Sequence, residues 1–320
     1  MRHVVPATPQ TVHVGSFDAR LPTVLTIDSG DEVVVETFTG TDVRGGRWPP
    51  SLATPAACAV WEHLPPDRHG PGPHLLTGPI AVRGAMPCDV LEVAVESIEL
   101  TADVAWVATL PGWGVLPPPF DAPRLTFVPL DRARGQAAFP PGSNLRVPLR
   151  PFFGCMGVAP AGAAVSSVPP GAFGGNMDLR ELTVGTRLLL PVQVQGAMLS
   201  VGDGHAAQGD GEVCTNALET HLCGVLRVTI RRDVPVTSPV VVTPEHLVVL
   251  GFGPTLDDAL HDSLAAMVRL LVHLLRLDPH AAYKFCSVAA HCRVTQAVNV
   301  PSKGVHVMLP WAVLGGSPLL

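Results

Sequence analysis

A glycine-rich segment near the middle of the chain carries five side chains suited to chemistry. Residues 201–212 read VGDGHAAQGDGE and contain two aspartates, a histidine, a glutamine and a glutamate. Glycine lets the backbone approach a ligand closely, but each glycine costs conformational entropy that a purely structural loop avoids. Carboxylates and an imidazole bind divalent metal ions and transfer protons. The composition of this segment therefore predicts a functional site.

Two familiar loop types do not fit this segment. Gly204 and Gly209 have the spacing of a P-loop, but Asp210 follows where that loop needs a lysine, and an aspartate repels phosphate. Ala207 and Cys214 occupy the fifth and twelfth positions of an EF-hand loop, which require ligands. We therefore expect no nucleotide cofactor and no EF-hand calcium site.

Alternate residues of the segment share a face wherever the chain is extended. Asp203 pairs with His205 in this way, and Asp210 pairs with Glu212. The alternative is a tight turn in which the aspartates accept backbone N–H groups, but histidine and glutamate have no such role in a turn. We predict that Asp203, His205 and Glu212 bind a divalent metal ion, with zinc as the first choice.

Other candidates lie outside this segment. Asn176 and Asp178 follow two glycines in GGNMD, where the alternative is an Asx turn. Cys155 lies in the apolar stretch PFFGCMGVAP, a setting typical of a buried, inert thiol. His74 precedes an expected strand, and Glu36 ends the first pair of strands; each alone is more often structural.

The composition excludes several classes of protein. The net charge of −6 and the presence of only two lysines leave no basic surface for nucleic acid. The longest apolar helix candidate is interrupted by Arg269, His273 and Arg276, so we expect no membrane span. Seven cysteines, an odd number without a CxxC pair, favour reduced thiols. We expect a soluble cytoplasmic protein with no nucleic-acid or membrane partner.

The same composition indicates a β-rich fold. Hydrophobic residues make up 47% of the chain, which also contains 34 prolines and 31 glycines and therefore many turns. We predict a mainly β protein with a few helices (β-rich α+β) and a sandwich- or barrel-like core. Residues 1–150 are expected to form a β-rich part, and residues 151–320 the site segment and an α/β part, together one compact unit.

Local patterns predict the main elements. Residues 21–38 and 78–100 each read as two strands around a turn, typical of a hairpin or a sharp strand connection. Residues 111–148, rich in proline and glycine, read as a long irregular excursion or a cover. Strand-like residues 183–194 and 225–230 flank the glycine-rich segment. One long amphipathic helix is expected over 256–277, with Thr255 as its N-cap, and a second, short helix after residue 279 leading into a strand.

Several segments together resemble the acetamidase/formamidase family. They include LPTVLTIDSGDEVVVET, FFGCMGVAP, FGGNMDLRELTVGTRLLLPV, LSVGDGHAAQGDGEV and AYKFCSVAAHCRVTQAV, in the order of the family. GGNMD and GDGHAAQGDGE are the most specific, whereas Asn299 stands where the family commonly has aspartate. The resemblance implies hydrolysis of a small aliphatic amide, such as formamide or acetamide, by a β-rich and usually oligomeric protein. We therefore expect a homo-oligomer and favour a dimer.

The leading hypothesis is a metal-assisted amidohydrolase. The ion polarises the amide carbonyl and lowers the pKa of bound water. Asp210 or Asp178 is then the general base, Asn176 orients the amide, and Glu36 is a further catalytic candidate. We assign substrate binding to His74, Cys155 and Gln208.

Two alternatives remain open at the level of the sequence. In one, Cys155 is the nucleophile of a cysteine amidase, with His74 or His205 as its base and Glu36 as orienting group. In the other, the chain is a β-rich module that binds a metal ion or a polar ligand without turnover.

Overall fold

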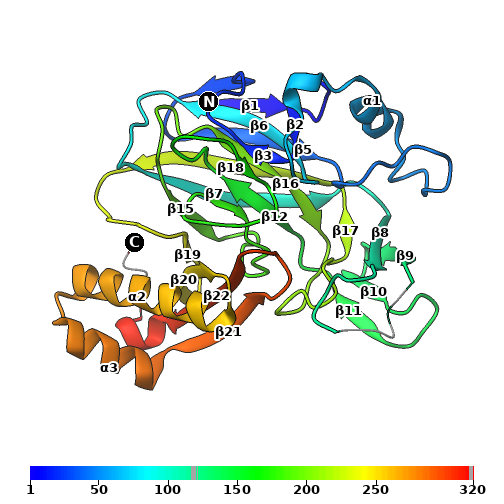
Figure 1. Ribbon diagram of the computed structural model, residues 1–320. Coiled ribbons are helices and arrows are strands. Elements are labelled where there is room, and N and C mark those ends of the chain that lie inside the picture. Colours follow the sequence, from blue (N-terminus) through cyan, green and yellow to red (C-terminus); the bar gives the residue numbers. More distant parts are fainter. Residues whose placement is uncertain (117–119, 121, 317–319) are drawn as a thin grey trace.

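The computed structural model describes residues 1–116, 120, 122–316 and 320. Strands dominate the fold. Two large sheets lie against each other, and the two longest helices pack on the part of one sheet that the C-terminal strands of the chain form (Figure 1). The nine-stranded sheet ends at β1 and β21 and does not close on itself. The prediction of a mainly β fold is confirmed, with a sandwich rather than a barrel at its centre.

The first sheet has nine strands drawn from both halves of the chain. In spatial order they are β1 (Arg2–Val5), β5 (Asp31–Thr37), β18 (Leu222–Arg231), β7 (Val90–Leu100), β15 (Arg187–Pro191), β19 (Val240–Val242), β20 (His246–Gly253), β22 (Lys303–Pro310) and β21 (His291–Gln296). Along β5 the side chains are alternately buried and half-buried, as expected for a strand with one face in the core.

The second sheet has eleven strands and carries most of the candidate residues. Its main path is β11 (Arg146–Pro148), β10 (Gln136–Ala138), β9 (Arg124–Asp131), β8 (Val104–Thr109), β17 (Glu219–Thr220), β16 (Leu199–His205), β12 (Phe152–Gly157) and β14 (Gly174–Asn176). β6 (Leu75–Val82) pairs with β16 and also with β2 (Val12–Val14) and β4 (Leu25–Ile27). A small sheet joins β3 (Ser16–Phe17) to β13 (Val165–Ser166).

The main hydrophobic core fills the space between the two sheets. Val35 of β5 and Val93 of β7 come from the first sheet, and Leu76 of β6 and Phe153 of β12 come from the second. All four side chains are buried. Burial of apolar surface stabilises the folded state by roughly 25 cal/mol per Å². Packing in this core therefore holds β12 and β16 in place.

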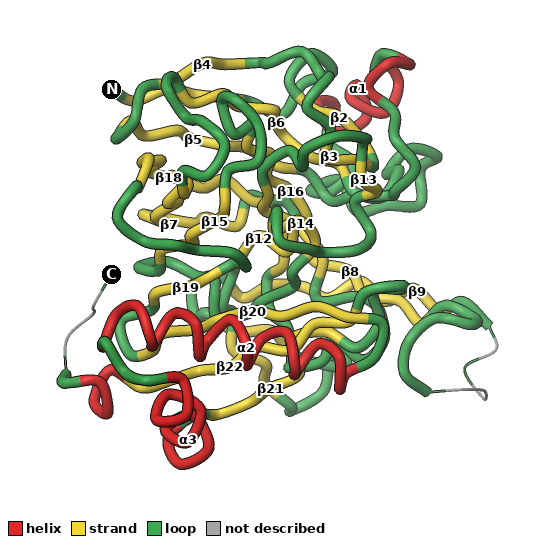
Figure 2. Tube along the Cα trace, turned by 60° about the vertical axis from the view of Figure 1, so that its left-hand side comes forward, coloured by secondary structure: helices red, strands yellow, loops and turns green. Residues whose placement is uncertain are grey.

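The two longest helices cover the part of the first sheet that the C-terminal strands form. α2 (Leu256–Leu275) lies along β20 and β22, and α3 (Pro279–Ala289) packs beside α2 and also contacts β22 (Figure 2). Met267 and Leu271 are buried, and Thr255 caps α2 by accepting the N–H of Asp258. The long helix, its N-cap and the shorter second helix agree with the sequence-based predictions. α2 ends two residues early because Arg276 is left-handed.

Three local predictions need correction. The strands of 21–38 and of 78–100 are joined by sharp connections and do not pair as hairpins, because β4 and β6 lie in one sheet while β5 and β7 lie in the other. The segment 111–148 is not irregular throughout, since β9, β10 and β11 form an antiparallel meander there; its residues 117–119 and 121 lie outside the described part. A short helix α1 (Pro55–His63), capped by Thr54, and 3₁₀ turns at Pro66–Arg68 and Trp311–Leu314 were not predicted.

Among the described residues, no helix is both long and apolar enough to cross a membrane.

The buried ring of His221, next to β17, makes stability depend on pH. Its Nδ1 accepts the N–H of Thr39 at 2.9 Å and its Nε2 donates to the carbonyl of Leu52 at 2.8 Å, so the ring is neutral. Burial lowers the pKa of His221 from 6.5 to about 4. As the pH falls, His221 is protonated in the unfolded chain near pH 6.5 but in the folded protein only near pH 4. Acidification from pH 6.5 towards pH 4 therefore lowers the free energy of unfolding by up to about 3 kcal/mol.

We therefore expect His221→Gln to lose less stability on acidification than the wild type. Urea unfolding at pH 7 and pH 4.5 should show a pH-dependent change that is smaller by about 2 to 3 kcal/mol in the variant. Equal pH-dependent changes in both proteins would contradict a neutral, buried His221.

Candidate functional site

Four carboxylates and one imidazole meet at the end of β16. Asp203 and His205 belong to β16, Glu219 to the neighbouring β17, Asp178 follows β14, and Glu212 lies in the turn after β16. All five are buried. They form two groups of close donor atoms, Asp203 with His205 and Glu219, and Asp178 with His205 and Glu212. We call these five residues the acid cluster.

Strand geometry explains how His205 meets its two nearest carboxylates. Asp203 and His205 are alternate residues of a strand and face the same side, as the sequence predicted. His205 is the direct cross-strand partner of Glu219. The Nε2 atom of His205 lies 3.3 Å from Asp203 Oδ2 and 3.3 Å from Glu219 Oε1.

Gln208 fixes the orientation of His205. Its amide nitrogen donates to the carbonyl of Asp178 at 2.7 Å, so its Oε1 must face the other way, where it lies 3.0 Å from His205 Nδ1. A carbonyl oxygen only accepts, and therefore Nδ1 carries the proton. The remaining Nε2 points into the acid cluster, as in histidines that bind metals.

Asp178 is held in place by Asn299, which the loop after β21 supplies. The side-chain nitrogen of Asn299 donates to Asp178 Oδ2 at 2.6 Å. Gln296, also buried, accepts the N–H groups of Val298 and Asn299 with its Oε1 and thereby fixes this loop. A residue more than a hundred positions away in sequence thus becomes part of the site.

The backbone is strained at three members of the acid cluster. Asp178, Asp203 and Glu212 have φ of 50°, 59° and 45°, in the left-handed region that residues other than glycine rarely adopt. Such conformations persist only where the surrounding structure enforces them, and they gather at functional sites.

Gly154 of β12 forms the floor beneath these side chains. A Cβ atom at this position would lie 2.5 Å from Asp203 Oδ2, 2.7 Å from Asp178 Oδ1 and 2.7 Å from His205 Cε1. Only glycine leaves room for the three groups to converge.

Burial and mutual repulsion shift the pKa values of the acid cluster. Burial, together with the charge of Asp203, raises the pKa of Asp178 to about 7. Burial likewise raises the pKa of Glu212 and of Glu219. Burial also opposes the charged forms of Asp203 and His205, but attraction between opposite charges outweighs it. His205 lowers the pKa of Asp203. Glu219 and Asp203 raise the pKa of His205.

The acid cluster fits a divalent cation. Among the described residues, neither Asp178 Oδ1 nor His205 Nε2 has a hydrogen-bond partner, although both atoms are buried. Two ligands bound tetrahedrally at about 2.0 to 2.1 Å lie about 3.3 Å apart, which matches the spacing of His205 Nε2 from its two carboxylates. Buried carboxylates are stable only when a positive charge compensates them. A set of imidazole and carboxylate ligands suits zinc and other divalent transition metals.

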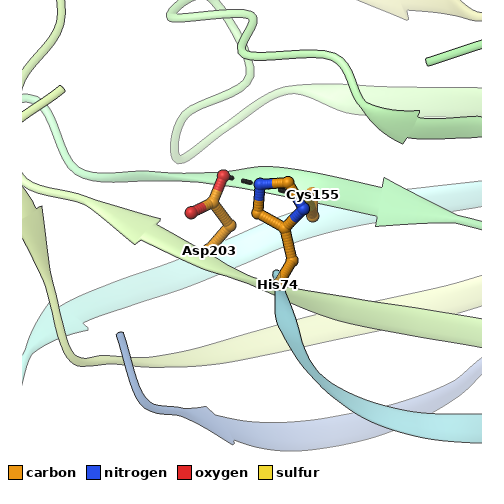
Figure 3. A group of neighbouring side chains, drawn as sticks. All are labelled: His74, Cys155 and Asp203. Carbon is orange, nitrogen blue, oxygen red and sulfur yellow. Dashed lines mark hydrogen bonds between the residues drawn. The ribbon is translucent and has the colours of Figure 1, made fainter. Parts of the chain in front are cut away.

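Cys155 and His74 lie beside Asp203 (Figure 3). The Cys155 thiol donates to Asn176 Oδ1 at 3.1 Å and lies 3.8 Å from Asp203 Oδ2. His74 Nδ1 lies 2.8 Å from the hydroxyl of Ser167. Burial and the charge of Asp203 raise the pKa of Cys155, so the group is a thiol.

The structure brings most of the sequence candidates together, but not all. Glu36 accepts the backbone N–H of Ala7 and lies outside the acid cluster. Asp210 is 39% exposed and faces Arg180 and Arg293, because it sits on the outer side of the turn. Gln208 holds His205 and does not line the pocket above the cluster.

The predicted ligand set also changes. Glu219, not Glu212, forms a group with Asp203 and His205, whereas Glu212 forms a group with His205 and Asp178. Sequence reasoning missed Glu219 and Gly154, and it noted Asn299 only as a departure from the aspartate that the family commonly has. Glu219 left a weak signal, a glutamate two residues before a histidine at the start of an apolar strand.

Comparison with known proteins shows what the chain is similar to. A sequence model of the Acetamidase/Formamidase family matches residues 161–315, which include all five members of the acid cluster. Over this part of its length the chain resembles the acetamidase/formamidase family. A solved structure, a recombinant predicted acetamidase/formamidase of Thermoanaerobacter tengcongensis, is 28% identical, with a TM-score of 0.84 over 99% of both chains. The family resemblance predicted from the sequence is therefore confirmed.

Curated relatives match this chain over shorter segments. The acetamidase of Mycolicibacterium smegmatis is 45% identical over 62 residues, which cover 19% of this chain and 14% of the relative. The formamidase of Methylophilus methylotrophus is 32% identical over 116 residues, or 31% and 27% of the two proteins. The matched segments thus span about a quarter or less of these two relatives.

Proposed function

We propose that this protein is an amidohydrolase that cleaves the C–N bond of primary amides to a carboxylate and ammonia, with a divalent metal ion, zinc first, held by Asp203, His205 and Glu219. The observation that carries this proposal is the 3.3 Å spacing of His205 Nε2 from both carboxylates, in a buried group with excess negative charge. The relatives named acetamidase and formamidase supply the amide as the substrate class.

When bound, the metal ion polarises the amide carbonyl and lowers the pKa of water. Asp178 is the general base in this scheme, because a carboxyl with a pKa of about 7 both takes and returns a proton near neutral pH. Its Oδ1 faces the cluster while Asn299 holds its Oδ2. Asp178 thus removes a proton from the attacking water and delivers it to the departing nitrogen.

Asn176 is the group that orients the amide. One N–H of its side chain donates to the carbonyl of Val168, and its Oδ1 accepts from the Cys155 thiol. The second N–H is therefore available for the substrate. His74, in the wall of the same pocket, is a further substrate contact.

The cysteine mechanism is less favourable on electrostatic grounds. A nucleophilic cysteine needs a lowered pKa, which positive neighbours supply. Cys155 instead is fully buried and lies beside Asp203, and both factors raise its pKa. We therefore propose that its thiol positions Asn176 and Asp203.

Metal removal tests the proposal. Purified protein should contain close to one divalent metal ion per chain, and dialysis against a chelator should abolish ammonia release from acetamide and formamide. Activity should return when zinc is added back. Full activity of the metal-free protein would contradict metal assistance, and a metal-loaded protein that releases no ammonia from any amide would indicate a binding module.

A further inference from the structure

The pocket above the acid cluster is much larger than formamide or acetamide requires. Its volume is about 580 Å³, within the roughly 300 to 1,000 Å³ typical of sites for drug-sized ligands. Acetamide consists of only two carbons, one oxygen and one nitrogen besides hydrogen. A small amide bound at the cluster would therefore leave most of the pocket to water.

The walls of this pocket differ in character. Carboxylates of the acid cluster and the amides of Asn176 and Asn299 form its polar floor. An apolar wall, named so from here on, consists of Pro71, Pro73, Trp106, Leu110, Trp113 and Val168. A wall of this kind favours an apolar group, because such a group loses water on binding.

Trp106 joins the apolar wall to the acid cluster. It lies on β8 directly opposite Glu219 of β17, so both side chains stand on the same face of the sheet. The Cβ atoms of such cross-strand pairs usually lie about 4.5 to 5.5 Å apart. Its Nε1 donates to Thr39 Oγ1 at 2.8 Å, and its ring meets Trp48 edge-on at 5.8 Å. The indole is therefore fixed in place beside a carboxylate of the cluster.

The surroundings of the cluster indicate which end of an amide meets the wall. Asp178 Oδ2 accepts a side-chain N–H of Asn299, which also donates to the backbone carbonyl of Asn176, and these polar groups suit an unsubstituted amino group. Glu219 has Trp106 beside it. With the carbonyl near His205, the acyl substituent then points towards the indole.

We propose that this site selects primary amides with a sizeable apolar or aromatic acyl group, which packs on Trp106, Leu110 and Trp113; this rests on the amidohydrolase function proposed above. Each methylene that contacts the wall raises kcat/KM about fourfold. Hexanamide and phenylacetamide should therefore be cleaved with at least about tenfold higher kcat/KM than acetamide.

The test is a substrate series on the metal-loaded protein. Ammonia release is measured for acetamide, butyramide, hexanamide and phenylacetamide with the wild type, Trp106→Ala, Trp113→Ala and the control Leu145→Ala. Leu145 is 66% exposed and does not line the pocket. The ratio of kcat/KM for hexanamide to that for acetamide should fall about tenfold in both tryptophan variants and stay unchanged in the control. Because Trp113 is 56% exposed, Trp113→Ala should fold. This variant tests the proposal if Trp106→Ala does not fold.

Three outcomes would overturn the proposal. If the wild type has a ratio of kcat/KM for hexanamide to that for acetamide of one or less, the proposed selectivity is wrong but amide hydrolysis still stands. If no amide is cleaved, both the selectivity and the amidohydrolase function are wrong. An unchanged ratio in Trp113→Ala, with loss of a dimer on size-exclusion chromatography, would assign the apolar wall to contact between two copies of the chain.

Discussion

Replacement of Gly154 by alanine should lower kcat/KM for amide hydrolysis at least about 100-fold while the protein stays folded. The added Cβ would lie 2.5 to 2.7 Å from side-chain atoms of Asp203, Asp178 and His205, distances that force them apart. A displacement of about 1 Å in catalytic groups costs on the order of 100-fold in rate. The bound metal per chain should fall as well.

Gly209→Ala is the matched control for this variant. Gly209 lies in the glycine-rich segment itself, has no atom within 4 Å of the added Cβ, and does not have a φ that side chains avoid. The two proteins should have similar circular dichroism spectra, and the extra methyl group in a packed site should cost Gly154→Ala about 1 to 3 kcal/mol in the free energy of unfolding. Unchanged metal content and kinetics in Gly154→Ala would contradict the convergence of the three side chains above β12.

Part of the candidate site could be predicted from the sequence because that part is local. Asp203 and His205 are alternate residues of one strand, so their common face follows from strand geometry alone. Glu212 was singled out for its place among glycines, although it forms a group with Asp178 and His205 and not with Asp203. Asp210 was an equally good candidate by type, and only the path of the turn places it outside, beside Arg180.

The rest of the site depends on pairing between distant strands. Glu219 reaches His205 because β17 adds to the edge of β16, and Asn299 reaches Asp178 through the loop after β21. Neither partnership leaves a periodic pattern in the sequence. The same holds for the sheets: local alternation predicted the strands of 21–38 and 78–100, but not that each pair divides between two sheets.

Asp203→Asn should reduce kcat/KM on acetamide by about a thousandfold and weaken metal binding. Asp203 is the residue that belongs both to the group with His205 and Glu219 and to the group with His74 and Cys155. Asparagine is nearly isosteric and tolerates the left-handed backbone that Asp203 adopts, so the change removes charge and little else. Loss of one charged ligand and of its attraction for His205 accounts for the effect.

Kinetics at several zinc concentrations, with metal analysis after dialysis, measure the two effects separately. Part of the lost activity should return as zinc is raised, because weaker binding is overcome by mass action. Asp210→Asn is the control, since its carboxylate lies two residues before Glu212 but faces Arg180 and Arg293 outside the cluster. We expect it to retain its metal ion and a kcat/KM within about twofold of the wild type, as is usual for exposed ion pairs. If Asp210→Asn were the inactive variant and Asp203→Asn the active one, the catalytic centre would lie on the outer side of the turn, and the acid cluster would have to be structural.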